Sequence, residues 1–178
     1  MAGSHRLSQR ISEGDGIALI VRVADADAAR AAEEAGAKAV AVDGPVDGIR
    51  AATSLPVLWL GRGRPADADA IVVGPADEAS DELETVVVAA DEEELEEALE
   101  THDPQIFLLA PAQDDDDVDA LECVLGLLPD VPAGKLAIAE LDAATRDDVL
   151  ALERAGFDAV LVAAGATREL VGERAPDF

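Results

Sequence analysis

The feature that most constrains the fold is a regular alternation of short apolar runs with Ala-, Glu-, Asp- and Leu-rich stretches from Ile17 onwards. This alternation is typical of βα units in a parallel sheet. Eight runs are predicted strands: Ala18–Val23, Ala39–Val42, Val57–Leu60, Ala70–Val73, Thr85–Ala89, Gln105–Leu109, Leu136–Glu140 and Ala159–Val162. Eight such units predict an α/β fold closed as a (β/α)8 barrel, and a doubly wound open sheet is the alternative with the same local pattern.

The stretches between these runs predict the helices that cover the barrel. They are Asp25–Ala35, Val46–Ala52, Asp77–Leu83, Asp91–Glu100, Asp114–Leu128, Thr145–Ala155 and a short Ala166–Gly172. Asp91 with Glu94, and Thr145 with Asp148, have the spacing of helix-capping pairs. Gly61–Pro65 is too rich in glycine and proline for a helix. We therefore expect a compact TIM barrel with shortened or missing crossover helices.

A short repeat supports the barrel over the open sheet. Ala35–Val40 reads Ala-Gly-Ala-Lys-Ala-Val, and Ala155–Val160 reads Ala-Gly-Phe-Asp-Ala-Val. Both predict a glycine that ends a helix and leads into the next strand. The two copies are 120 residues apart, which equals six units of 20.

Composition excludes several classes of function. The chain has 178 residues and is expected to form one domain, residues 1–178, with residues 1–16 as a short lead-in. A net charge of −26 argues against nucleic acid and anionic membranes as partners, and it reflects a solvated acidic surface or adaptation to high salt. No apolar run approaches a membrane span, and the N-terminus has no secretory apolar region, so we expect a cytoplasmic protein. The single cysteine, Cys123, rules out an intramolecular disulfide.

Several motifs resemble, in the same order, those of the indole-3-glycerol-phosphate synthases. Ser4–Val23 resembles that family's lead-in and first strand, and Ala32–Ala37 is similar to its Y-E-x-G-A motif. Leu55–Leu58 reads Leu-Pro-Val-Leu, like the family's L-P-V-L, and Thr145–Val162 resembles its last helix and strand. The resemblance implies a phosphate-binding barrel of tryptophan biosynthesis. Its reaction would be a lyase-type ring closure with loss of CO2 and water, which uses a lysine acid, acidic partners and phosphate donors.

The residues at the family's catalytic positions are largely different here. Arg22 stands where the resemblance places a lysine, and Glu140 is retained from the strand-seven motif S-E-S-G-I. Leu60 occupies the place of the catalytic lysine and Val88 that of a catalytic glutamate, and neither side chain can transfer a proton. With Leu141 they are expected to make the barrel mouth apolar. Arg22 and Glu140 are thus the candidate catalytic residues.

Two further groups are candidate ligand-binding residues. The loop after the last strand could offer backbone amides to a phosphate at a helix N-terminus, or Thr167 could simply cap that helix. Arg62 and Arg64 could bind a phosphate or carboxylate, or could offset nearby acids on the surface. The predicted anion-binding set is therefore Gly165, Ala166, Thr167, Arg168, Arg62 and Arg64.

Two functions compete on this pattern. One is a barrel that has lost most catalytic residues, of natural or engineered origin, serving as a scaffold or a self-assembling subunit. The other is an active carboxy-lyase of the synthase type, or another phosphosugar enzyme, that uses Glu140 and Arg22 in altered roles. The expected partners are a phosphorylated small molecule and further copies of the chain, bound through apolar helix faces. No cofactor and no metal is predicted. The run Asp114–Asp117 lacks the spacing of a calcium loop.

Overall fold

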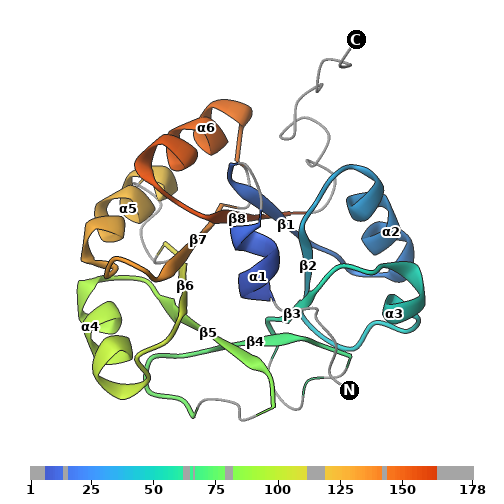
Figure 1. Ribbon diagram of the computed structural model, residues 1–178, viewed down its shortest axis with the longest axis horizontal. Coiled ribbons are helices and arrows are strands. Elements are labelled where there is room, and N and C mark those ends of the chain that lie inside the picture. The colour runs from blue at the N-terminus through green and yellow to red at the C-terminus, as the bar shows by residue number, and fades with distance from the viewer. Residues whose placement is uncertain are drawn as a thin grey trace.

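The computed structural model contains a closed barrel of eight parallel strands in the order β1 to β8, with β8 paired to β1 (Figure 1). It describes residues 7–13, 16–61, 65, 67–78, 82–111, 119–141 and 144–163. The strands are β1 (Ala18–Arg22), β2 (Ala39–Val42), β3 (Val57–Trp59), β4 (Ala70–Val73), β5 (Glu84–Ala89), β6 (Ile106–Leu109), β7 (Leu136–Glu140) and β8 (Ala159–Val162). Each lies within one residue of its predicted bounds at either end, and the (β/α)8 barrel is confirmed.

Helices cover the outside of most of the barrel (Figure 1). They are α2 (Ala26–Glu34), α3 (Ile49–Ala52), α4 (Glu92–Thr101), α5 (Ala120–Leu127), the 3-10 turn η1 (Leu128–Asp130) and α6 (Arg146–Ala155), with α1 (Leu7–Ser12) preceding the first strand. Both predicted capping pairs are present. The Asp91 carboxylate accepts from the Glu94 amide at 2.9 Å, and Thr145 and Asp148 form a reciprocal capping box.

The predicted helix Asp77–Leu83 is wrong. Its described residues, Asp77, Glu78, Glu82 and Leu83, are not helical. The Gly74 amide instead donates to Asp77 Oδ2 at 2.8 Å, a local turn that competes with helix formation. In the preceding crossover, residues 61, 65 and 67–69 contain no helix, as the glycines and Pro65 predicted.

Other helix bounds also differ from the prediction. α3 begins at Ile49 rather than Val46, because Gly48 precedes it in a left-handed conformation with φ of 76°. α5 begins at Ala120, and residues 114–118 of its predicted span lie outside the described residues, as does Ala166–Gly172. The repeat is confirmed, since Gly36 and Gly156 both have positive φ, 101° and 111°, and each leads into a strand.

The barrel interior is filled by inward-facing side chains that alternate along each strand. Four strands begin with an inward alanine, and this leaves space at the N-terminal end of the barrel. Leu7 and Ile11, one turn apart on α1, fill that space and are 0% and 2% exposed. The interior cluster comprises Leu7, Ile11, Ala18, Ile20, Ala39, Ala41, Leu58, Ala70, Val86, Ile106, Leu108, Ile138, Ala159 and Leu161.

A second apolar cluster lies between the strands and the helices. It contains the outward side chains of the strands, for example Trp59 and Val160, and the buried faces of the helices, for example Leu95 and Leu152. Leu141, which we expected at the mouth, belongs to this outer cluster and is 6% exposed. That prediction is wrong because Glu140 points inward, so the next residue must point outward.

At the N-terminal edge of the barrel, two aspartate carboxylates each join neighbouring strands through a hydrogen bond, and we call these two hydrogen bonds braces. Asp69, just before β4, accepts a hydrogen bond from the Val57 amide of β3 at 2.9 Å. Asp158, just before β8, accepts one from the Ala137 amide of β7 at 2.9 Å. Each carboxylate satisfies a strand amide at the edge of the sheet, which would otherwise be a costly unpaired donor.

Two further pairs tie the helices to this same edge. Ser8 of α1 donates through its hydroxyl and its amide to the Glu84 carboxylate on β5. Ser54, in the loop before β3, donates through its hydroxyl and its amide to Glu33 of α2. The Ser54 hydroxyl is the main cause that lowers the pKa of Glu33, and partial burial opposes it.

Candidate functional site

The ionisable residues Arg22, Glu140 and Asp43 meet at the C-terminal end of the barrel. Arg22 and Glu140 are the last residues of β1 and β7, and Asp43 directly follows β2. Because parallel strands all end at the same rim, side chains from non-adjacent strands meet there. Arg22 Nη2 donates to Glu140 Oε1 at 3.0 Å, and Arg22 Nε lies 3.7 Å from Asp43 Oδ2.

The ion pairs that Arg22 forms with described residues differ in tightness and exposure. The Glu140 side chain is 19% exposed and that of Arg22 is 32% exposed, so this pair is partly shielded from water. The Asp43 side chain is 66% exposed, and its distance from Nε exceeds that of a hydrogen bond. Glu140 is therefore the firm partner of Arg22, and Asp43 is a looser one.

The remaining inward positions described near the mouth are apolar. Leu60, Val72 and Val88 are partly buried and pack against the interior cluster. The resemblance to the synthases places a catalytic lysine at position 60 and a catalytic glutamate at position 88. Neither Leu60 nor Val88 can donate or accept a proton, so this part of the mouth cannot perform general acid–base chemistry.

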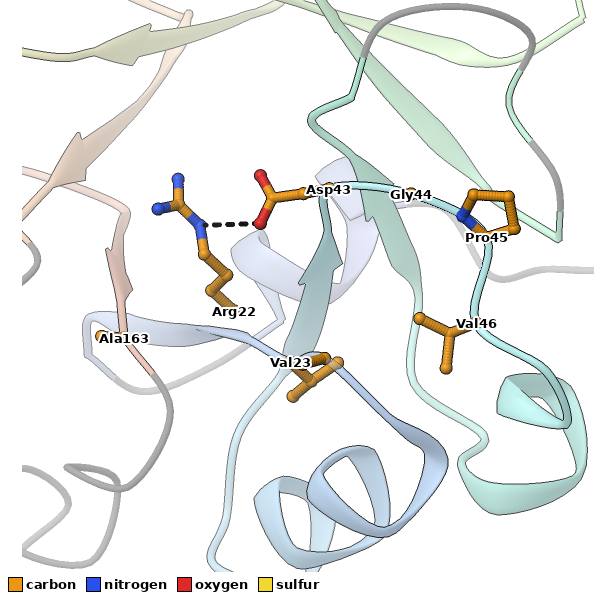
Figure 2. A pocket seen from close by; sticks show the side chains of 8 residues that line it. Arg22, Val23, Asp43, Gly44, Pro45, Val46 and Ala163 are labelled. Atoms are coloured by element: carbon orange, nitrogen blue, oxygen red, sulfur yellow. Dashed lines mark ion pairs between the residues drawn. The ribbon is translucent and has the colours of Figure 1, made fainter.

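A pocket of about 410 Å³ opens beside Arg22 (Figure 2). Its walls come from the ends of β1, β2 and β8, and Figure 2 shows Arg22 and Asp43 pointing toward one another in it. The lining residues are Arg22, Val23, Ala24, Asp43, Gly44, Pro45, Val46 and Ala163. The pocket thus combines one ion pair with small apolar groups, a common composition of small-molecule sites.

Gly61 fixes the loop that carries Asp43. A Cβ atom added at position 61 would lie 2.1 Å from the Asp43 carbonyl oxygen, far inside van der Waals contact. Only glycine allows the chain after β3 to approach the loop after β2 this closely. The backbone of Asp43 is held by this contact, whereas its carboxylate stays accessible.

The structure brings together only part of the predicted site. Arg22 and Glu140, the two candidate catalytic residues, are in contact. Gly165, Ala166, Thr167, Arg168, Arg62 and Arg64 lie outside the described residues, as does Asp114–Asp117. Within the described ranges, no group of three His, Cys, Asp or Glu side chains could hold a metal ion.

Residues 43–46, which form one wall of the pocket, were not predicted as site residues from the sequence. Val42-Asp43-Gly44-Pro45 was readable as a strand end followed by a turn, and an acid at a strand's C-terminal end is a signal for a site. Asp43 is the residue that could have indicated the site. One aspartate is hard to single out as a site residue in a chain with 39 acidic residues.

Comparisons with known proteins identify the fold. No protein-family model and no curated protein sequence matches the chain. Among solved structures, it is similar to thiamine phosphate pyrophosphorylase from Pyrococcus furiosus, with 18% identity, a TM-score of 0.64, and coverage of 87% of this chain and 93% of that one. It is also similar to (S)-3-O-geranylgeranylglyceryl phosphate synthase from Thermoplasma acidophilum, solved with sn-glycerol-1-phosphate, with 16% identity, a TM-score of 0.62 and 93% coverage of both chains. At such identities the likeness shows a shared (β/α)8 barrel and nothing finer.

In the part of the chain that the structure describes, no helix has the length and apolarity needed to cross a bilayer.

Proposed function

We propose that this chain is a barrel of the phosphate-binding class that has lost lyase chemistry and serves as a non-catalytic scaffold or assembly subunit. The observation that carries the proposal is the packing of Leu60 and Val88 against the interior cluster at inward positions of the mouth. Among the described residues of the mouth, Arg22 and Glu140 form an ion pair at 3.0 Å, and Asp43 lies beside Arg22. Ring closure with loss of CO2 and water needs a proton donor, and an arginine is too weak an acid for that role.

Membership of the phosphate-binding class is supported by the two structural neighbours. One is named for thiamine phosphate, and the other was solved with a glycerol phosphate as its substrate. The sequence expectation of an anion loop at residues 165–168 points the same way. We propose that a phosphorylated small molecule is the ligand class inherited with this fold.

An active lyase of the indole-3-glycerol-phosphate synthase type is the second candidate, and one contact favours it. Glu140 and Arg22 lie beside a pocket at the rim where barrels of this fold place their active sites. In that role, Glu140 would accept a proton and Arg22 would hold an anionic group of the substrate.

Turnover of carboxyphenylamino-deoxyribulose phosphate, followed by indole fluorescence, separates the two candidates. The scaffold proposal expects no product above the buffer rate. Turnover that is lost in Glu140→Gln, and kept in the matched variant Glu153→Gln on the exposed face of α6, would establish the lyase and overturn the scaffold.

Self-association is the part of the proposal that needs its own measurement. The most exposed large apolar side chain among the described residues is Leu150 on α6, at 37%. A light-scattering mass of a dimer or larger, in both low and high salt, would support an assembly subunit. A monomer in both conditions would contradict that version and leave the single barrel as the functional unit.

A further inference from the structure

The pocket beside Arg22 presents the carboxylate of Asp43 to solvent. Of the two charged residues among its described lining, Asp43 is the more exposed, with 66% of its side chain accessible. Its described ion pair is with Arg22, whose Nε lies 3.7 Å from Asp43 Oδ2, beyond the distance of a hydrogen bond. Gly61 packs against the Asp43 carbonyl oxygen and fixes the backbone behind this carboxylate. A ligand can therefore contact Asp43 without displacing a hydrogen bond described for its side chain.

Arg22, the other charged residue of the lining, is already engaged. Its Nη2 donates to Glu140 Oε1 at 3.0 Å, and it has a further interaction besides those with Glu140 and Asp43. We therefore assign no ligand contact to the guanidinium. One guanidinium faces two carboxylates at this rim, on a chain with a net charge of −26, so these charges sum to a negative value. Asp43 thus lies in a field that attracts cations and repels anions.

The rest of the described lining is aliphatic. It includes Val23, Pro45 and Val46, beside the ion pair (Figure 2). Such a wall fits a short aliphatic group, because a polar group buried against it would be left unpaired. The described lining residues include no aromatic ring, the surface that binds quaternary ammonium groups. A primary ammonium group gains more here, because its N–H groups can donate a charge-assisted hydrogen bond to Asp43.

We propose that this pocket binds a short aliphatic primary amine in its protonated form. The ammonium group donates to the Asp43 carboxylate, and the aliphatic tail lies against Val23, Pro45 and Val46. Arg22 keeps its contact with Glu140. The site requires no reaction, so it goes beyond the proposed function and holds whether the barrel is a scaffold or a lyase.

The test uses n-butylamine, which is protonated at pH 7, and four molecules that each change one feature. 1-Butanol has a similar tail without a charge, methylamine has the charge without the tail, and butyrate has the opposite charge. Butyltrimethylammonium keeps the charge and the tail but has no N–H donor. Isothermal titration of the full chain at about 0.15 M salt should show saturable butylamine binding at one site. The four comparison molecules should each bind at least about tenfold more weakly.

Two variants localise the binding. Asp43→Asn should weaken butylamine binding at least about tenfold, because a neutral amide cannot pair with the ammonium charge. Asp47→Asn removes an equal charge from an exposed residue of the same loop and should bind butylamine like the unmodified chain. The two variants together separate a site at Asp43 from a general attraction of cations to an acidic surface. Unchanged circular dichroism and melting temperature would show that both variants are folded.

A second localisation needs no variant. Amide chemical shifts of the unmodified chain should change on butylamine addition at Val23 and at residues 43–46, and stay constant at the N-terminal edge of the barrel. This measurement decides the location of the site if Asp43→Asn does not fold.

Four results would overturn the proposal. The first is no saturable butylamine binding up to roughly 50 mM, well above the millimolar range of weak specific sites. The second is a comparison molecule that binds as tightly as butylamine. The third is a folded Asp43→Asn protein that binds butylamine as tightly as Asp47→Asn. The fourth is a set of shifted amides that excludes Val23 and residues 43–46.

Discussion

The two ends of the barrel use charged side chains in different ways. At the N-terminal edge, Asp69 and Asp158 accept hydrogen bonds from strand amides, and Glu84 and Glu33 accept them from serines. At the C-terminal edge, Arg22 contacts Glu140 and Asp43, and these side chains border an open pocket. At the first edge each of these four carboxylates accepts from a backbone amide, and Asp69 also pairs with Arg50 at 2.8 Å. At the second edge these charged side chains contact one another beside a pocket. In barrels of this fold the N-terminal edge generally serves stability and the C-terminal edge carries the active site, and we expect the same division here.

The largest expected effect is at the closed end. Leu7→Ala removes a side chain that is 0% exposed and packs on the inward alanines, so it should lower the free energy of unfolding by about 2–5 kcal/mol. Urea unfolding followed by circular dichroism measures the change. Gln9→Ala, on the exposed face of the same helix, should change it by less than about 0.5 kcal/mol. A loss under about 1 kcal/mol in Leu7→Ala would mean that α1 does not close the barrel.

Removing a brace should have the next largest effect. Asp158→Ala leaves the Ala137 amide without its side-chain acceptor and should cost about 1–3 kcal/mol in urea unfolding. Glu97→Ala, an exposed acid on α4, is the matched control and should be nearly neutral. An Asp158→Ala protein that is as stable as the Glu97→Ala control would show that this hydrogen bond does not stabilise the N-terminal edge.

A change at the open end should cost less. Glu140→Gln keeps the shape of the side chain but removes the charge that faces Arg22 at 3.0 Å. Because the two side chains are 19% and 32% exposed, water screens much of the attraction, and we expect a loss of about 1 kcal/mol. A loss above about 3 kcal/mol would show that the mouth is a structural element like the N-terminal edge.

The smallest effect should depend on pH. The folded-state pKa of Glu33 lies below its ordinary value of 4.5, mainly because the Ser54 hydroxyl donates to its carboxylate. A lowered pKa contributes stability that is complete above the ordinary value and is lost as the pH falls through the folded value. Ser54→Ala should therefore cost under about 1 kcal/mol at pH 7, and the difference should shrink as the pH falls below about 4.5. A difference that stays constant from pH 7 to pH 3 would exclude Glu33 as its source.

The strands, and the placement of Arg22 and Glu140 at strand ends, could be predicted from the sequence. Strands buried on both faces appear as continuous apolar runs, and their last residues must meet at one rim. The sequence could not predict that Asp43 would join the contact between Arg22 and Glu140. Its position depends on the close approach of Gly61 to the loop after β2, which is a property of the assembled barrel.

The helices show where local sequence is insufficient. Asp77–Leu83 has the composition of a helix, yet the carboxylate of Asp77 forms a turn with the Gly74 amide. α1 has six residues, which is too few for a helix that is stable alone. It forms because Leu7 and Ile11 enter a space lined by the inward alanines of four strands. In both segments, contacts outside the expected helix decide the conformation.

The two aspartate braces have a consequence for how the chain could be divided. Leu58 pairs with Ala70 between β3 and β4, and Ile138 pairs with Ala159 between β7 and β8, so the two braces occupy equivalent places four strands apart. Each half of four strands therefore carries its own brace at the same position. A cut in the crossover between β4 and β5 would leave both braces intact, whereas a cut between β3 and β4 or between β7 and β8 would separate a carboxylate from its amide donor. We therefore expect fragments divided between β4 and β5 to keep more of the native edge than fragments divided at a braced crossover.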